Sequence, residues 1–406
     1  MKKSLLVFSL ILSFFTFTAC QKAKINTADD LDVALGKIYD GSKFPGFSVA
    51  VIKNDEVAFQ KSYGFANVTA KTAFTNQTTQ NIGSVSKLMI SISLMQCVEK
   101  GLFTLETNIN DILPFKVTNP NSPNEPIKIK HLATHTSGIV DDAATYQADY
   151  AILKGEDVST PIAKLLLETY KAKQNGEVMT LGDFVKNYLT PTGKLYKASN
   201  FSNHKPGENY AYSNIAASLA GYIVEVKTKI PFDVYTKTNI FTPLGMKNTA
   251  WNIADLDKKN VAIQYWTKSQ PLPFYTSSSY PDGNLNSSLE DMSVFMTAMM
   301  KGFSGNSTFL KPDTWKLMYD KKLSPLPTNM NAKEDNSGTF WVWFKNGRLG
   351  HTGSNPGIFT FLAFTPDKKT GFYFSGNVDL EEGDDSKALS ETQQKIITAI
   401  KEFEAK

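Results

Sequence analysis

The chain has 406 residues, of which 41% are hydrophobic and 20% charged, so it carries enough apolar material for a large buried core. Its formal net charge is only +4, and Arg348 is the single arginine beside 42 lysines. This balance does not indicate a nucleic-acid-binding protein, and the sequence has no arginine cluster for phosphate recognition.

The first residues have the pattern of a secretory leader. Two lysines at positions 2–3 precede an apolar run from Leu5 to Phe17, which is too short to span a bilayer comfortably. The run ends in Phe-Thr-Ala-Cys at 17–20, which resembles the bacterial lipobox, with phenylalanine where leucine is more usual. We therefore expect residues 1–19 to be a lipoprotein signal peptide.

Cleavage before Cys20 would leave that cysteine lipidated, with residues 20–27 as a polar tether. The lipid would hold a soluble enzyme outside the cytoplasm, at the periplasmic or outer-membrane face of the cell envelope. The alternative is an ordinary leader in which Cys20 lies near the cut by chance. The other cysteine, Cys97, falls in an apolar helical run and is expected in the core, so no intramolecular disulfide is expected.

The mature chain begins with a helix and a hairpin. Residues 28–41 predict an amphipathic helix that ends at a glycine. Two β-rich runs follow at 47–53 and 56–65, and Asn54-Asp55 between them is a hairpin signal.

The C-terminal end repeats this style. Residues 339–353 predict a strand, an Asn-Gly turn at 346–347 and a second strand. Residues 358–364 and 371–378 predict another strand pair, and 386–406 predict a closing helix.

The long middle, roughly 68–335, is mostly helical or irregular, with breaks rich in proline and asparagine at 114–126 and 269–284. We therefore expect an α/β (α+β) fold over residues 28–406. Both chain ends would form one antiparallel five-stranded sheet flanked by the terminal helices, and a large, mainly helical lobe would be inserted between them. A cleft between two such lobes is a natural place for a functional site.

Ser84 and Lys87 form an S-x-x-K pair where a strongly apolar run begins. The run from 84 to 100 predicts a helix that is apolar on nearly every face and therefore buried. Positions i and i+3 share a face, so the lysine amine would lie beside the serine hydroxyl at the first turn. The helix dipole and the low dielectric both favour a neutral amine there, which can take the hydroxyl proton. The alternative is a serine N-cap with a lysine that reaches solvent.

Two further patterns supply what acyl transfer to serine needs, namely a proton donor for the leaving group and a stabilised oxyanion. Tyr212-Ser213-Asn214 is the single Y-x-N in the chain and precedes a helix rich in small residues. His351-Thr352-Gly353 lies on a predicted C-terminal strand, where a glycine lets a substrate backbone approach closely.

Together these features resemble the serine β-lactamase and penicillin-binding protein superfamily, and more narrowly its class C-like branch of D-peptidases, esterases and related serine hydrolases. The resemblance covers nearly the whole mature chain in the family's order. Besides the three motifs, it rests on the segments 127–139, 231–249, 280–296 and 350–367.

The resemblance implies a β-lactamase/transpeptidase-like fold and a role for each motif residue. Ser84 would form the acyl-enzyme and Lys87 would activate it. Tyr212 would pass a proton to the leaving group, and Asn214 would hydrogen-bond the acyl side of the substrate and Lys87.

On the strand, the resemblance implies that Ser354 contributes its backbone N–H to the oxyanion hole, together with that of Ser84. His351 and Thr352 would line the leaving-group side, and Gly353 would belong to the substrate-binding residues.

Two departures from the family pattern bear on the substrate. Many members have lysine where this chain has His351, and histidine is a weaker anchor for a substrate carboxylate. Arg348 could assist, but its place after the Asn-Gly turn favours a solvated edge residue. The region 141–144, Asp-Asp-Ala-Ala, lacks the glutamine of class C enzymes, and no class A deacylating glutamate is evident, so efficient antibiotic hydrolysis is not expected.

Other features favour structural roles. His131 and His135 have the i, i+4 spacing of metal ligands but no third ligand nearby, so we expect no metal site. Several aromatic residues could line an acyl pocket, although core packing is the default interpretation: Tyr265, Trp266, Phe274, Tyr275 and Tyr280.

The sequence thus predicts an exported, lipid-anchored serine hydrolase that needs no metal or organic cofactor. Its partners would be a small ester or a D-amino-acid peptide as substrate and the membrane through its lipid alone, without nucleic acid. The alternatives are a penicillin-binding D-alanyl-D-alanine carboxypeptidase or weak class C-like β-lactamase and, from another class, a non-catalytic binding lipoprotein.

Overall fold

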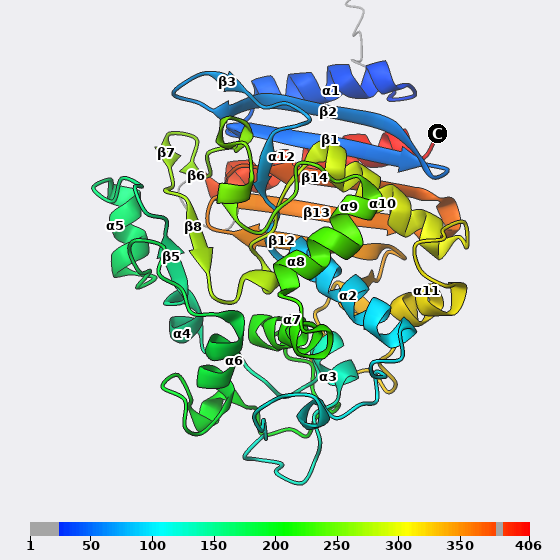
Figure 1. Ribbon diagram of the computed structural model, residues 1–406. Helices are drawn as coiled ribbons and strands as arrows, with labels where there is room; N and C mark the ends of the chain where they lie inside the picture. The colour runs from blue at the N-terminus through cyan, green and yellow to red at the C-terminus, as the bar shows by residue number, and fades with distance from the viewer. Residues whose placement is uncertain (1–23, 379–384) are drawn as a thin grey trace, which may run out of the picture.

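The structure is a computed structural model that describes residues 24–378 and 385–406 (Figure 1). The expected signal peptide, Cys20 and residues 21–23 of the tether lie outside the described residues.

An antiparallel sheet occupies the upper part of the molecule in Figure 1. Its strands come from both ends of the chain, as predicted, because β1 pairs with β2 on one side and with β14 on the other. In spatial order they are β10 (Glu334–Ser337), β11 (Val342–Phe344), β12 (Leu349–Asn355), β13 (Ile358–Thr365), β14 (Thr370–Gly376), β1 (Gly46–Lys53), β2 (Glu56–Asn67) and β3 (Thr72–Ala73).

The sheet has eight strands where five were predicted. The strand runs identified in the sequence correspond to six of the eight, and the remaining two are β3 and β10. These two strands are short: β3 has two residues, and β10 has four, all of them polar. Neither carries a strand pattern of its own. Each forms because the edge of an existing strand offers unpaired backbone groups.

The predicted hairpins are confirmed. Asn54 and Asp55 connect β1 to β2 with φ angles of 52° and 64°, which suits the mirror-image turns of tight hairpins. Gly347 turns between β11 and β12 at φ 80°, and the Phe344 N–H donates to the carbonyl of Arg348.

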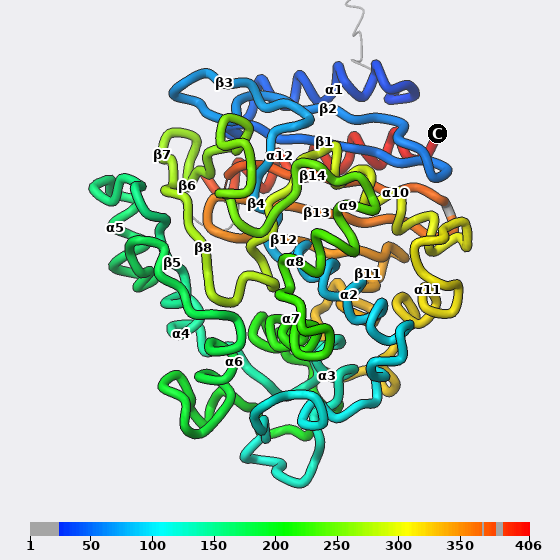
Figure 2. The backbone as a smooth tube through the Cα atoms, in the orientation of Figure 1, coloured from blue at the N-terminus to red at the C-terminus, as the bar shows by residue number. Residues whose placement is uncertain are grey.

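The terminal helices α1 (Ala28–Asp40) and α12 (Ser386–Glu404) lie side by side on one face of the sheet (Figure 2). Strand alternation explains why both faces of the sheet are covered. In β1, Val49 and Val51 join the core beneath these two helices, whereas Ala50 and Ile52 face the larger core on the other side.

That second face is covered by α10 (Leu289–Phe303), which packs on β1, β2 and β14. α10 belongs by sequence to the middle of the chain that was predicted as a separate helical lobe. It joins the sheet because the apolar residues on this second face must also be buried. The middle segment and the sheet therefore share one continuous core.

The middle of the chain is built around α2 (Lys87–Glu99) and α7 (Asn214–Thr228), which pack together below the sheet in Figure 1. Around them lie α3 (Ile129–Ala133), α4 (Ala143–Gln147), α5 (Pro161–Glu168), α6 (Leu181–Leu189), α8 (Phe232–Thr236), α9 (Thr242–Leu244) and α11 (Pro312–Tyr319). Short strands pair here as β4 (Thr79–Asn81) with β9 (Asn286–Ser288), β5 (Tyr150–Ile152) with β8 (Tyr275–Ser277), and β6 (Tyr265–Thr267) with β7 (Gln270–Pro271).

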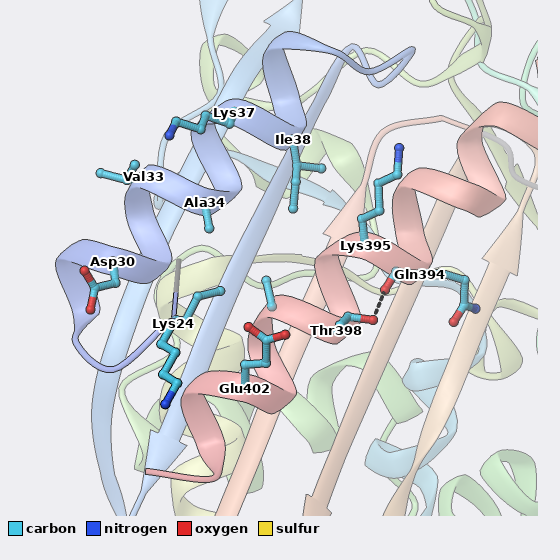
Figure 3. Close-up of a pocket in the computed structure, with 12 residues that line it drawn as sticks. Lys24, Asp30, Val33, Ala34, Lys37, Ile38, Gln394, Lys395, Thr398 and Glu402 are labelled. Atoms are coloured by element: carbon cyan, nitrogen blue, oxygen red, sulfur yellow. Dashed lines mark hydrogen bonds between the residues drawn. The ribbon is translucent and has the colours of Figure 1, made fainter. Parts of the chain in front are cut away.

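A groove of about 600 Å³ lies between α1 and α12 (Figure 3). Residues of both helices line it, among them Ile38 of α1 and Thr398 of α12, and the site residues predicted from the sequence are not among them. Within the two described ranges, no helix combines the length and the apolar character that crossing a membrane requires.

Candidate active site

Ser84 lies on a 3-10 turn, η1 (Gly83–Ser86), and Lys87 is the first residue of α2. The sequence predicted an α-helical first turn, and the tighter turn improves the pairing because side chains at i and i+3 eclipse in a 3-10 helix. The Lys87 Nζ and Ser84 Oγ atoms are 3.0 Å apart. Lys87 is completely buried, so it does not reach solvent.

Lys87 has two further partners that can act only as acceptors. Its Nζ atom lies 2.7 Å from Asn214 Oδ1 and 2.6 Å from the main-chain oxygen of Asp282. The amine also donates to Ser84 Oγ, so three hydrogen bonds hold Nζ in place. The site therefore fixes the lysine nitrogen beside the serine hydroxyl, within reach for a proton transfer between them.

Tyr212 and Asn214 flank the N-cap of α7. Ser213 is the N-cap, and the carboxylate of Asp141 accepts hydrogen bonds from the Ser213 hydroxyl and the Asn214 N–H, both at 2.7 Å. A carboxylate suits this place, because the first N–H groups of a helix lack partners within the helix. The Tyr212 ring centroid is 5.0 Å from Lys87 Nζ, and the tyrosine is 40% exposed, so it borders both the buried amine and solvent.

His135 supports Tyr212, a contact that the sequence analysis missed. The two rings stack with centroids 4.4 Å apart and an interplanar angle of 29°. The Ser213 N–H donates to His135 Nδ1 at 3.2 Å. Burial first, and then the nearby Lys87, lower the pKa of His135 well below its ordinary value, so the ring is neutral. The feature that distinguishes His135 within the segment Thr-His-Thr-Ser-Gly is its positive φ angle of 55°. That angle is visible in the folded structure and not in the sequence.

The backbone at the edge of β12 lies very close to the backbone of η1. A methyl group on Gly353 would lie 2.2 Å from the Ile82 carbonyl oxygen and 3.0 Å from the Ser84 amide nitrogen. A methyl group on Gly83 would lie 2.7 Å from the Ser354 amide nitrogen. The amide nitrogens of Ser84 and Ser354 therefore border the same junction between β12 and η1.

This junction is possible because β11 pairs only with Leu349 and Gly350, so β12 runs on past its neighbour from His351 onward. Along that stretch Thr352 is exposed, whereas the His351 side chain is buried. Burial and the positive charge of Lys87 lower the pKa of His351 to about 4. At neutral pH position 351 therefore lacks the positive charge that a family lysine would provide.

Arg348 does not supply that charge, and the prediction of a solvated edge residue is wrong. Its side chain is 10% exposed and forms a two-pronged ion pair with Glu404 near the end of α12. The guanidinium carbon also lies 5.1 Å from the centroid of the Phe372 ring. Arg348 is thus a structural link between β12 and α12, on the side of the sheet away from Ser84.

The residues considered for other sites have structural contacts. His131 Nδ1 accepts the Lys128 N–H at the start of α3, and no group of three His, Cys, Asp or Glu side chains among the described residues could hold a metal ion. Two members of the aromatic set pack in the core: the Tyr265 hydroxyl accepts the Val68 N–H, and Tyr280 contacts Trp251 edge-to-face.

The family model described as Beta-lactamase matches residues 31–394, which is most of the chain. The chain belongs to the beta-lactamase family. The superfamily of β-lactamases and penicillin-binding proteins consists largely of serine hydrolases, and the serine and lysine of this chain meet within that fold.

Relatives of the chain are distant. It is 25% identical over 368 residues to "Protein flp" of Staphylococcus aureus (strain MW2), covering 88% of this chain and 63% of that protein. It is 23% identical to "Beta-lactamase-like protein 4" of Dictyostelium discoideum, covering 88% and 60%. The chain therefore spans less than two thirds of these relatives.

Solved structures share the fold. The octameric penicillin-binding protein homologue from Pyrococcus abyssi aligns with a TM-score of 0.64 at 23% identity, covering 86% of this chain and 73% of that one. A beta-lactamase/D-alanine carboxypeptidase from Yersinia pestis, complexed with citrate, aligns with a TM-score of 0.63 at 21% identity, covering 91% and 99%.

Proposed function

We propose that the protein is an exported serine hydrolase that cleaves small esters or D-amino-acid peptides through an acyl-enzyme on Ser84. The observation that carries the proposal is the environment of Lys87, which is completely buried and has its N–H groups directed to Asn214 and to the Asp282 carbonyl. A binding protein has no need of a base prepared in this way beside a serine hydroxyl.

The proposed chemistry follows from these positions. Ser84 Oγ attacks the substrate carbonyl carbon while its proton passes to Lys87 Nζ. The carbonyl oxygen becomes an oxyanion, to which the N–H groups of Ser84 and Ser354 donate hydrogen bonds. Tyr212 delivers a proton to the leaving alcohol or amine, and water then releases the acid by the reverse sequence of proton transfers.

The charge of the site favours esters over substrates that end in a carboxylate. His351 is buried with its pKa lowered to about 4, and Arg348 is engaged by Glu404. A β-lactam or a terminal D-amino acid carries a carboxylate, which would find no cation from either residue. An uncharged leaving group loses nothing at such a site, so small esters are the first substrate class to test.

The test is the burst of p-nitrophenol from p-nitrophenyl acetate with residues 21–406. We expect a burst for the native protein and its loss in Ser84→Ala. Ser91→Ala is the matched control, because Ser91 is a buried serine on α2, the helix that follows η1. Equal rates for the native protein and Ser84→Ala would refute the hydrolase.

The alternative is a penicillin-binding carboxypeptidase or a weak class C-like β-lactamase, for which the common fold is the support. Labelling with a fluorescent penicillin and measuring its release separates these activities. Stable labelling of Ser84 indicates a penicillin-binding protein, and rapid release indicates a β-lactamase. A non-catalytic binding lipoprotein would show neither a burst nor labelling.

Export and lipidation at Cys20 belong to this proposal and rest on the leader pattern of residues 1–20. The membrane partner would be reached through this lipid. Palmitate labelling of the full chain in bacterial cells is expected, and it should disappear in Cys20→Ser. Labelling that persists in that variant would show that Cys20 is not the lipidated residue.

A further inference from the structure

A second carboxyl group lies behind the Ser84–Lys87 pair. Asp282 ends the short turn η7 (Tyr280–Asp282), and the residue is only 2% exposed. Its main-chain oxygen is the closest acceptor of Lys87, at 2.6 Å from Nζ. One residue thus combines a direct contact with the amine and an ionisable side chain in the same dry region.

The side chain of Asp282 is held by two neutral hydroxyl groups. Tyr146 of α4 donates to Oδ1 at 2.8 Å, and Ser218 of α7 donates to Oδ2 at 2.9 Å. Hydrogen bonds of this kind favour the ionised carboxylate, but they do not neutralise its charge. The carboxylate is therefore solvated by the protein and keeps its field available to charges nearby.

The ionisable groups that face Asp282 come from four elements. Lys87 of α2 favours the anion, and Asp141 in the segment before α4 opposes it. The phenols of Tyr146 and of Tyr150 on β5 stay neutral, because burial and the charge of Asp282 raise their pKa values. Among the described residues, Lys87 is the cation whose charge favours the Asp282 carboxylate.

We propose that Asp282 is a positioning residue for acylation of Ser84, whose carboxylate is the counter-charge for the ammonium that forms when Lys87 takes the serine proton. This inference rests on the proposed function. A proton transfer from serine to lysine creates a positive charge in a completely buried place, where an uncompensated ion is strongly disfavoured. When the Asp282 carboxyl is ionised, its negative charge offsets that cost as the ammonium forms.

The main chain and the side chain of Asp282 have different roles. The main-chain oxygen holds the Lys87 amine beside Ser84, and it remains when the side chain is changed. The carboxylate supplies only charge, because its oxygens are occupied by Tyr146 and Ser218. Asp282→Asn therefore removes the charge at nearly constant shape and leaves the orientation of the amine in place.

The proposal makes opposite predictions for two parts of the pH profile. Asp282→Asn removes a negative charge close to the base that accepts the Ser84 proton, so acylation should persist to lower pH. The acid limb of the acylation rate should then move down by about one pH unit. The plateau rate should fall about tenfold or more, because the ammonium formed during acylation has lost its counter-charge.

The experiment measures acylation of residues 21–406 by p-nitrophenyl acetate from pH 4.5 to 9, following the mass of the Ser84 adduct. The matched control is Asp291→Asn. Asp291 is also a buried aspartate, bonded to the Thr249 hydroxyl and the Asn248 N–H, but Lys87 is not among the charges acting on it. Its profile should match the native one in shape.

Tyr146→Phe provides a second variant that keeps the carboxylate and removes one of its donors, and its acid limb should move in the same direction by a smaller amount. A limb that stays in place in both Asp282→Asn and Tyr146→Phe overturns the inference, even where the rates are lower. Absence of any Ser84 adduct in the native protein instead overturns the proposed function, so the two failures are distinguishable.

Discussion

Ionised Asp282 should lower the stability of the folded protein, and Asp282→Asn measures this effect independently of catalysis. Burial raises the pKa of Asp282 from 3.8 to about 6, with Lys87 and the two hydroxyl donors opposing the rise. A raised acid pKa means that the folded protein binds this proton more tightly than the unfolded chain. The resulting stability is fully present below the unfolded pKa and is lost as the pH rises through the folded one.

The size of the effect follows from the shift. A difference of about two units corresponds to about 3 kcal/mol in the free energy of unfolding, of which about 2 kcal/mol is lost between pH 4.5 and 7.5. The variant has no charge at this position, so it is not subject to that loss. The unfolding free energy of Asp282→Asn minus that of the native protein should therefore increase by about 2 kcal/mol over this range.

The assay is urea unfolding of residues 21–406, followed by the fluorescence of the five tryptophans at several pH values. Taking the difference between the two proteins cancels the other groups that titrate in this range. A difference that stays constant with pH would mean that Asp282 keeps an ordinary pKa in the fold. In that case burial would not disfavour the Asp282 carboxylate in the way that the structure indicates.

Three further outcomes are expected. Arg348→Met should destabilise the fold by about 3–5 kcal/mol by leaving Glu404 buried without its partner, while acylation per folded molecule stays unchanged; a large loss of acylation would contradict the structural role. Gly353→Ala should abolish the Ser84 adduct in a protein that still unfolds cooperatively, because the new methyl would lie 2.2 Å from the Ile82 oxygen; normal acylation would exclude this close approach. His351→Lys should lower KM for substrates with a carboxylate in the leaving group, since the neutral histidine provides no anchor. An unchanged KM would show that residue 351 does not bind that carboxylate.

Much of the fold could be predicted because turns and helices are specified by short stretches of sequence. Asn54-Asp55 and Gly347 specify tight turns by their own backbone preferences, and the terminal helices follow from apolar spacing over a few turns. The pairing of Ser84 with Lys87 is equally local, since residues three apart in a helical turn share a face whether the turn is α or 3-10.

The errors came from features without a local signal. The polar strand β10 forms only because β11 offers it an edge. Arg348 follows an exposed turn in the sequence, yet Glu404, its partner 56 positions away, lies beside it once α12 covers the sheet. A charge after a turn is normally solvated, and only the packing of a distant helix reverses that expectation.

By itself, the sequence determined that this protein places a serine and a lysine at the start of a buried helix and builds a sheet from its two ends. The tertiary structure alone decided what surrounds that pair. The Asp282 carbonyl that orients Lys87 comes from 195 positions away, and the Tyr146 hydroxyl that holds the Asp282 carboxylate from 136. Hydrogen-bond geometry and burial, which control the charge of a lysine, depend on such distant segments meeting, and no spacing along the chain encodes them.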